Sequence, residues 1–147
     1  MGDVIVVGTD GSETAKQAVT EAVRLAKALS AELHLVSAFE PLRAHVTGAP
    51  EGAARVWAPR PDDQVEATLS DAASRVRLAE VPVTTHAIRD DPAEALLDVA
   101  GKVGASMIVV GSQGMHGTRR LTLGNVPNKV SHHARCNVLI VATDTPR

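Results

Sequence analysis

Several residue types that mark whole classes of protein are rare in this chain of 147 residues. Cys136 is the sole cysteine, so no intramolecular disulfide can form, and a reducing compartment is the natural setting. Phe39 and Trp57 are the only aromatic residues, which removes the stacking platforms that single-stranded nucleic acid binders use. The formal net charge is −2, so no global basic field would attract nucleic acid or an anionic membrane.

Long hydrophobic runs are lacking as well. No apolar stretch approaches the roughly 20 residues of a membrane span, and the N-terminus lacks a basic region followed by an apolar signal core. The apolar content of 44% and the charged content of 22% are ordinary for a globular protein. We therefore expect one cytoplasmic domain over residues 1–147, with no nucleic-acid or membrane partner.

What the sequence does contain is an alternation of buried strands and amphipathic helices. Short apolar runs rich in β-branched residues predict strands at residues 4–7, 33–36, 83–88, 107–110 and 138–141. Apolar residues at helical spacing, the first set running from Ala15 to Leu29, predict helices at residues 15–29, from 62 to 76, from 92 to 101 or 104, and from 125 onward. The alternation predicts an α/β fold: a doubly wound, Rossmann-like, parallel five-stranded sheet with helices on both faces.

Two segments have compositions that set them apart from this alternation. Thr84, Thr85 and His86 interrupt the third predicted strand, which favours a place at the edge of the sheet. Residues 40–60 are rich in proline and predict a long loop.

Glycines are concentrated after the fourth predicted strand. Four of the 11 glycines lie there, namely Gly111, Gly114, Gly117 and Gly124. Glycine lets a backbone approach an anion closely, and the helix that begins at Asn125 would direct free N–H groups and the positive end of its dipole at it. The segment predicts a phosphate cradle, with a plain flexible connection as the alternative. It has no Gly-Lys-Ser/Thr ending of a P-loop, and residues 8–12 hold only two of the three glycines of a dinucleotide fingerprint.

The two loops are expected to face each other. In a doubly wound sheet, ligands bind beyond the carboxyl ends of the strands, where the strand order reverses. The loops after the first and fourth strands would then flank one crevice, with Asp10 opposite residues 111–124. Asp10 is also a good turn or capping residue, and the two roles are compatible.

The spacing Gly111-x2-Gly114-x9-Gly124-Asn125 resembles the G-x2-G-x9-G-S/T nucleotide loop of the universal stress protein family. Residues 6–12, VVGTDGS, are similar to the V-G-x-D-G-S opening of that family, and the two motifs stand in the family's order. The resemblance extends over essentially the whole chain. It implies a stress-response protein that binds an adenine nucleotide, with ATP, alone or with Mg²⁺, as the ligand.

The resemblance also implies which residues bind. Thr9 and Asp10 would contact the adenine and ribose, and Ala38, at the end of the second strand, would line the base pocket. The phosphates would be held by the glycine loop and the first helical turn: Gly111, Gly114, Gly124, Asn125 and Val126. Arg119 would neutralise phosphate charge, unless it is simply a solvated surface arginine.

Asn125 stands where the family has Ser or Thr, and Pro127 where it often has Ser. Residues 123–131, LGNVPNKVS, are similar to an actinobacterial branch of the family in which cyclic AMP binding is known. Cyclic AMP has one phosphate and would tolerate a less complete cradle, so it is the alternative to ATP.

Patterns for catalysis and for metal binding are lacking. No residue is an obvious base for activating water, so we expect a binding protein with no catalytic residues and at most slow, incidental ATP hydrolysis. His132 and His133 are adjacent in a predicted helix and point in different directions, so no metal site is predicted. A nucleotide-dependent enzyme and a dimeric interaction module that has lost nucleotide binding are the remaining alternatives.

The resemblance finally implies a homodimer. Members of the family usually pair their last strands across a two-fold axis, which here would join two copies through Val138–Val141. That apolar run would otherwise leave an exposed sheet edge, which proteins avoid.

Overall fold

The structure, a computed structural model, describes residues 2–39, 61–112 and 125–143. Within them, five strands alternate with four helices, as the sequence predicts. The strands are β1 (Val4–Gly8), β2 (Glu32–Ala38), β3 (Val83–Ile88), β4 (Met107–Gly111) and β5 (Asn137–Val141). The helices are α1 (Glu13–Leu29), α2 (Pro61–Leu78), α3 (Pro92–Val103) and α4 (Asn125–His133). The loop predicted at 40–60 lies outside the described residues.

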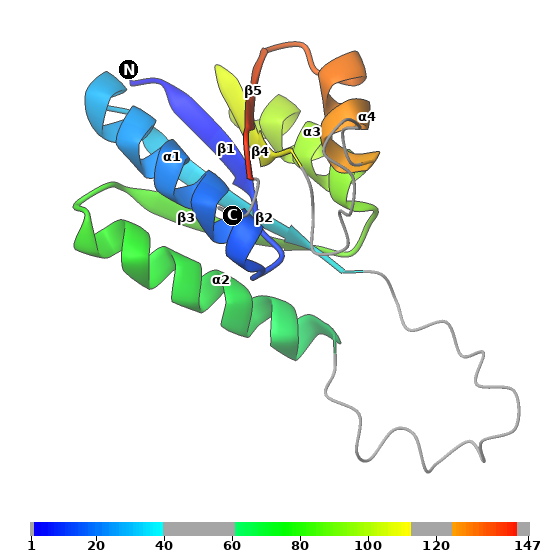
Figure 1. The fold of residues 1–147 in the computed structure, drawn as a ribbon, viewed down its shortest axis with the longest axis horizontal. Coiled ribbons are helices and arrows are strands. Elements are labelled where there is room, and N and C mark those ends of the chain that lie inside the picture. Colours follow the sequence, from blue (N-terminus) through cyan, green and yellow to red (C-terminus); the bar gives the residue numbers. More distant parts are fainter. Residues whose placement is uncertain (1, 40–60, 113–124, 144–147) are drawn as a thin grey trace, which may run out of the picture.

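All strand pairs are parallel, and the sheet order is β3-β2-β1-β4-β5. The doubly wound α/β fold is therefore confirmed, and so is the edge position of β3. From β1 the chain moves outward through β2 to β3, then returns to the other side of β1 to form β4 and β5 (Figure 1). The order reverses between β1 and β4, which pair directly at Val7 and Val109.

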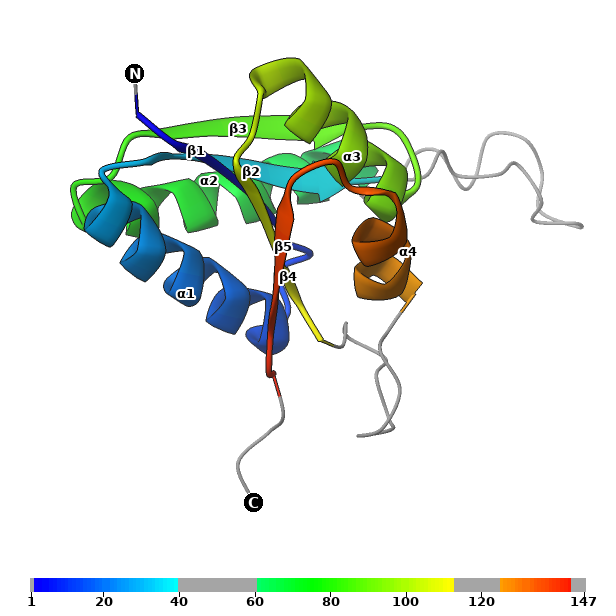
Figure 2. The same ribbon diagram turned by 90° about the horizontal axis from the view of Figure 1, so that it is seen from above.

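The helices form a layer on each face of the sheet, with α1 and α2 on one side and α3 and α4 on the other (Figure 2). Alternate strand residues point to opposite layers. Ile5 and Val7 pack in the core beneath α1 and α2, whereas Val6 packs in the core beneath α3 and α4. Because β1 and β4 are buried on both faces, their central residues are all apolar.

The helix ends follow local chemistry. Ser12 caps α1 by accepting a hydrogen bond from the Ala15 N–H at 3.1 Å, and Asp91 caps α3 by accepting one from the Glu94 N–H at 3.2 Å. Gly104, in the left-handed conformation (φ 65°), ends α3. Leu29, expected on the inner stripe of α1, is instead 45% exposed. It is the last helical residue, and the left-handed Ser30 turns the chain back toward β2 there.

A histidine pair joins β2 to the edge strand β3. His34 Nδ1 lies 2.8 Å from His86 Nε2, and the rings are stacked with their centres 5.1 Å apart. The other ring nitrogen of His34 bonds to Glu32 Oε1. With both rings neutral, His86 Nε2–H donates to His34 and His34 Nε2–H donates to Glu32, an assignment that follows from the network. Burial, and then the neighbouring His34, lower the pKa of His86.

Acid is expected to weaken the fold through this pair. Because the folded-state pKa of His86 is lowered, the folded chain binds fewer protons than the unfolded chain, whose histidines titrate near pH 6.5. The free energy of unfolding should therefore have its full value above about pH 6.5 and should fall as the pH drops below that value. Urea unfolding at pH 7.5 and 5.5 measures this loss.

His86→Gln is the matched variant, since an amide can donate to His34 but does not titrate. Both acidic residues of α3 are paired with a lysine, Glu94 with Lys129 and Asp98 with Lys102. An unchanged loss of stability between pH 7.5 and 5.5 in His86→Gln would contradict the assignment.

Candidate functional site

The candidate site lies at the carboxyl edge of the sheet, where the strand order reverses. Thr9 follows β1 and Ser112 follows β4, and these two strands are neighbours. This is the place where doubly wound sheets bind ligands. The loops that follow β1 and β4 therefore begin side by side, as the sequence predicts.

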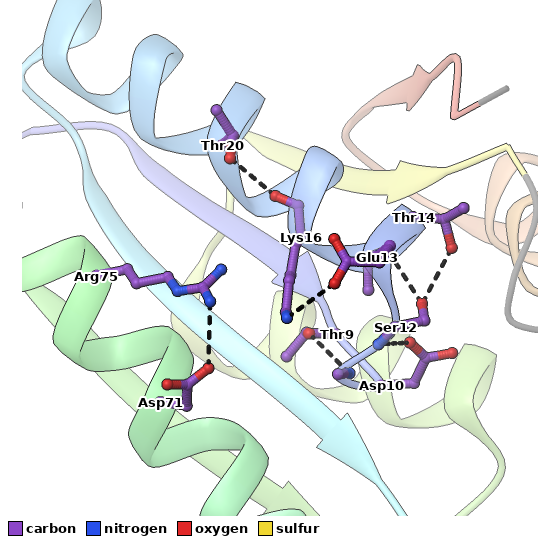
Figure 3. Close-up of polar contacts among 11 residues, drawn as sticks. Thr9, Asp10, Ser12, Glu13, Thr14, Lys16, Thr20, Asp71 and Arg75 are labelled. Atoms are coloured by element: carbon purple, nitrogen blue, oxygen red, sulfur yellow. Dashed lines mark hydrogen bonds and ion pairs between the residues drawn. The ribbon is translucent and has the colours of Figure 1, made fainter. Parts of the chain in front are cut away.

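The turn from Thr9 to Ser12 is held by its own polar groups (Figure 3). The Thr9 N–H donates to the Val36 carbonyl at 2.9 Å, which ties the turn to β2. The Gly11 N–H donates to Thr9 Oγ1 at 3.3 Å, and the Ser12 N–H donates to Asp10 Oδ1 at 2.9 Å. The turn role expected for Asp10 is thus present, and the exposed side chain of Asp10 stands at the edge of the site.

Gly11 adopts a backbone conformation that other residues rarely adopt, with φ 81°. A Cβ atom there would lie 3.2 Å from Thr68 Oγ1 on α2, a tight contact. Glycine therefore lets the turn both reverse and approach α2.

Ala38 lies at the end of β2, paired in register with Ile88 of β3. It is half-buried and follows Val36, the acceptor for Thr9, by two residues. The structure therefore brings Thr9, Asp10 and Ala38 to the same edge of the sheet.

Hydrogen bonds join the ends of β4 and β5 just beyond Gly111. The Ser112 N–H donates to the Val141 carbonyl at 2.8 Å. The Thr143 N–H donates to Ser112 Oγ at 3.2 Å, and the Ser112 and Thr143 hydroxyls lie 3.1 Å apart. Gly111, paired with Val141, is thus held where β4 leaves the sheet.

The described part of α4 spans Asn125–His133. The first N–H groups of a helix have no acceptor within it, and they form its anion-binding end. Asn125 is exposed and Val126 half-buried, whereas Pro127 and Val130 are buried against the sheet side. Pro127 supplies no N–H, so α4 offers one donor fewer than a helix with Ser at that position.

Lys129 links α4 to α3, a contact that the sequence does not reveal. Its ammonium lies 2.8 Å from Glu94 Oε1 and 3.5 Å from Asp91 Oδ2. The hydrogen bond to Glu94 raises the pKa of Lys129. The positive charge of Lys129 is therefore paired with acidic side chains of the α3 end.

The remaining predicted site residues, Gly114, Arg119 and Gly124, lie outside the described residues. Over residues 2–39, 61–112 and 125–143, no cluster of His, Cys, Asp and Glu could hold a metal ion. In the same ranges, no helix combines the length and the apolar character that a membrane span needs.

The profile of the universal stress protein family matches residues 1–142. The chain belongs to the universal stress protein family. It is 34% identical over 143 residues to a universal stress protein of Mycobacterium tuberculosis, covering 95% of each chain. It is 32% identical over 150 residues to the universal stress protein YxiE of Bacillus subtilis, covering 96% of this chain and 99% of that one.

A solved universal stress protein in complex with cyclic AMP has the same fold, with a TM-score of 0.72 and 28% sequence identity. The match covers 97% of this chain and 98% of the other. The family resemblance read from the two glycine-containing motifs is thereby confirmed.

Proposed function

We propose that this universal stress protein is a cytoplasmic stress-response domain that binds an adenine nucleotide reversibly and is not an enzyme. The observation that carries the proposal is the place of the Thr9–Ser12 turn, beside the end of β4 where the strand order reverses. A solved relative with 28% identity is in complex with cyclic AMP, which supports an adenine nucleotide as the ligand class.

The residues divide between the two ends of the nucleotide. Thr9, Asp10 and Ala38 would receive the base and ribose at the ends of β1 and β2. Gly111 and Gly114 would approach the phosphates through their backbones, with Arg119 adding positive charge. Gly124, Asn125 and Val126 would present the N-terminus of α4 to the phosphates.

The ligand is either ATP or cyclic AMP, and a calorimetric titration of the nucleotide-free protein with each, with and without magnesium, separates them. ATP binding that strengthens with magnesium would show that Asn125 and Pro127 leave a complete triphosphate cradle. Tighter binding of cyclic AMP would show a single-phosphate site and a role in sequestering that messenger. Binding of neither would overturn the proposal in favour of the protein-interaction alternative, and phosphate release from ATP would favour an enzyme.

Asp10 offers a matched pair of variants. Asp10→Asn keeps an oxygen that can accept from the Ser12 N–H, whereas Asp10→Ala loses both the turn and the polar group. The loss of one hydrogen bond between Asp10 and the nucleotide, worth about 1–1.5 kcal/mol, weakens nucleotide binding by about tenfold. We expect that loss in Asp10→Ala and a smaller one in Asp10→Asn, as measured by calorimetry. Asp98→Ala, on the exposed side of α3, is the control, and equal affinity of Asp10→Ala and the native chain would remove Asp10 from the site.

We also propose a homodimer through β5. This strand is an edge of the sheet, and its residues Val138 to Val141 are only half-buried within one chain. Pairing with the same strand of a second copy would satisfy the free backbone groups and cover these side chains. Sedimentation velocity should show a dimer at micromolar concentration, and a monomer throughout the concentration range would contradict it.

A further inference from the structure

A hollow lies between α1 and α2, on the face of the sheet opposite α3 and α4. It has a volume of about 420 Å³, which is within the range of small-molecule sites. Val19 and Val23 of α1 and Ala67 and Ala72 of α2 form the apolar part of its walls, and the charged side chains of Lys16, Asp71 and Arg75 also line it. Thr9 and Gly11 close one end, where Gly11 approaches Thr68 of α2. We call this hollow the α1–α2 groove.

The groove exists because the two helices face each other with short side chains. Thr20 on α1 and Ala67, Thr68 and Ala72 on α2 stand where larger apolar residues would fill the space. Neighbouring helices on a sheet normally interdigitate their side chains at native packing density. The side chain of Val23 is consequently left partly exposed to water. Covering this apolar surface with an apolar ligand would be favourable.

Two cations line the groove from opposite helices. Figure 3 shows the Lys16 ammonium and the Arg75 guanidinium both directed into the space between α1 and α2. Lys16 Nζ lies 3.1 Å from Glu13 Oε1 on the same helix, but the Glu13 side chain is 85% exposed and does not line the groove. Asp71 does line the groove, but its Oδ2 lies 3.6 Å from Arg75 Nη2, longer than a charge-assisted hydrogen bond of about 2.7–2.9 Å. Neither cation is held in a tight, buried pair, and the two cations outnumber the single carboxylate of the lining, so the groove keeps a net positive charge that attracts an acid.

We propose that the α1–α2 groove is a second binding site, for a small amphipathic anion with an apolar body and one acidic group. The apolar body would lie against Val19, Val23 and Ala72, and the acidic group would bind between Lys16 and Arg75. Apart from Thr9, none of the residues proposed to bind the nucleotide lines this groove. The site therefore does not depend on nucleotide binding.

The test uses two dyes that share one apolar ring system. The probe 1-anilinonaphthalene-8-sulfonate carries an acidic group, and N-phenyl-1-naphthylamine is the same framework without it. A fluorescence titration of the full chain should show one saturable site for the sulfonate, with the neutral dye binding several-fold more weakly. Equal affinity for the two dyes would overturn the proposal, because the cations would then contribute nothing.

Variants locate the site. Arg75→Gln and Lys16→Gln should each weaken binding of the sulfonate up to about fivefold, the range for a partly exposed ion pair, without changing the affinity for the neutral dye. Ala67→Leu, at an exposed helix position, should fill the groove and abolish saturable binding of both dyes. Arg77→Gln, also on α2 but outside the groove, is the matched control.

Competition separates this groove from the nucleotide site. ATP and cyclic AMP should leave the dye bound, and displacement of the dye by either nucleotide would place it in the nucleotide site and overturn the proposal. Native-like binding of the sulfonate in the Lys16 and Arg75 variants would overturn it equally. If neither nucleotide binds at all, the effects of these variants still decide the question.

Discussion

Leu35→Ala is expected to lower the free energy of unfolding by about 2.7–5 kcal/mol. Leu35 is 0% exposed, on a central strand, in the core beneath α1 and α2. Truncation removes the transfer free energy of the buried methyl groups and leaves a cavity that a close-packed sheet and helix layer can only partly close. Native domains have about 5–15 kcal/mol of stability in total, so this change would remove a large fraction of it.

Urea unfolding followed by circular dichroism measures the loss, and Leu78→Ala is the matched control. Leu78 ends α2 and is 86% exposed, so the same chemical change should alter stability by no more than about 0.5 kcal/mol. Similar effects of the two substitutions would contradict the core assignment.

Val130→Asp should be similarly damaging, with a loss of stability of at least about 3 kcal/mol. Val130 is 0% exposed and packs α4 into the core on the other face of the sheet. A carboxylate at this position would be buried among apolar side chains, so α4 must leave the sheet or the carboxyl group must take up a proton. Amide hydrogen exchange would show the lost protection in α4, and the nucleotide binding that we propose should disappear with it.

Asn128→Asp adds the same charge to the same helix at an exposed position. It lies in the first turn of α4, where a negative charge is favourable by about 0.3–1 kcal/mol. We therefore expect native or slightly raised stability in this control. Native stability in Val130→Asp would mean that α4 is not anchored by its buried face.

The fold could be predicted from the sequence because each element has its own local signal. The continuous apolar runs at residues 4–7 and 107–110 predict strands buried on both faces, and both strands lie inside the sheet. Asp91, Pro92 and Glu94 predict the start of α3 through capping chemistry that involves only neighbouring residues.

Contacts that depend on register could not be predicted in this way. His34 stands in a predicted strand, but its partner His86 is 52 positions away, and only the pairing of β2 with β3 brings the rings together. The Lys129–Glu94 pair and the α1–α2 groove likewise follow from how helices lie on the sheet. At the candidate site, the turn at Asp10 is local and could be predicted from its residues, whereas the role of Ala38 rests on the family resemblance.

The hydrogen bonds between Ser112 and Thr143 would couple dimerisation to ligand binding. Ser112 stands where β4 leads toward the glycine loop, and it is bonded to the end of β5, the strand at the open edge. A second chain added along β5 would restrict the same backbone that a ligand beyond β4 would restrict. Once either event has ordered this segment, the other event pays less of the entropic cost of ordering it. The coupling between ligand binding and dimerisation is the same in both directions. A ligand that strengthened the pairing of two chains would, by the same factor, be held more tightly by the pair than by either chain alone.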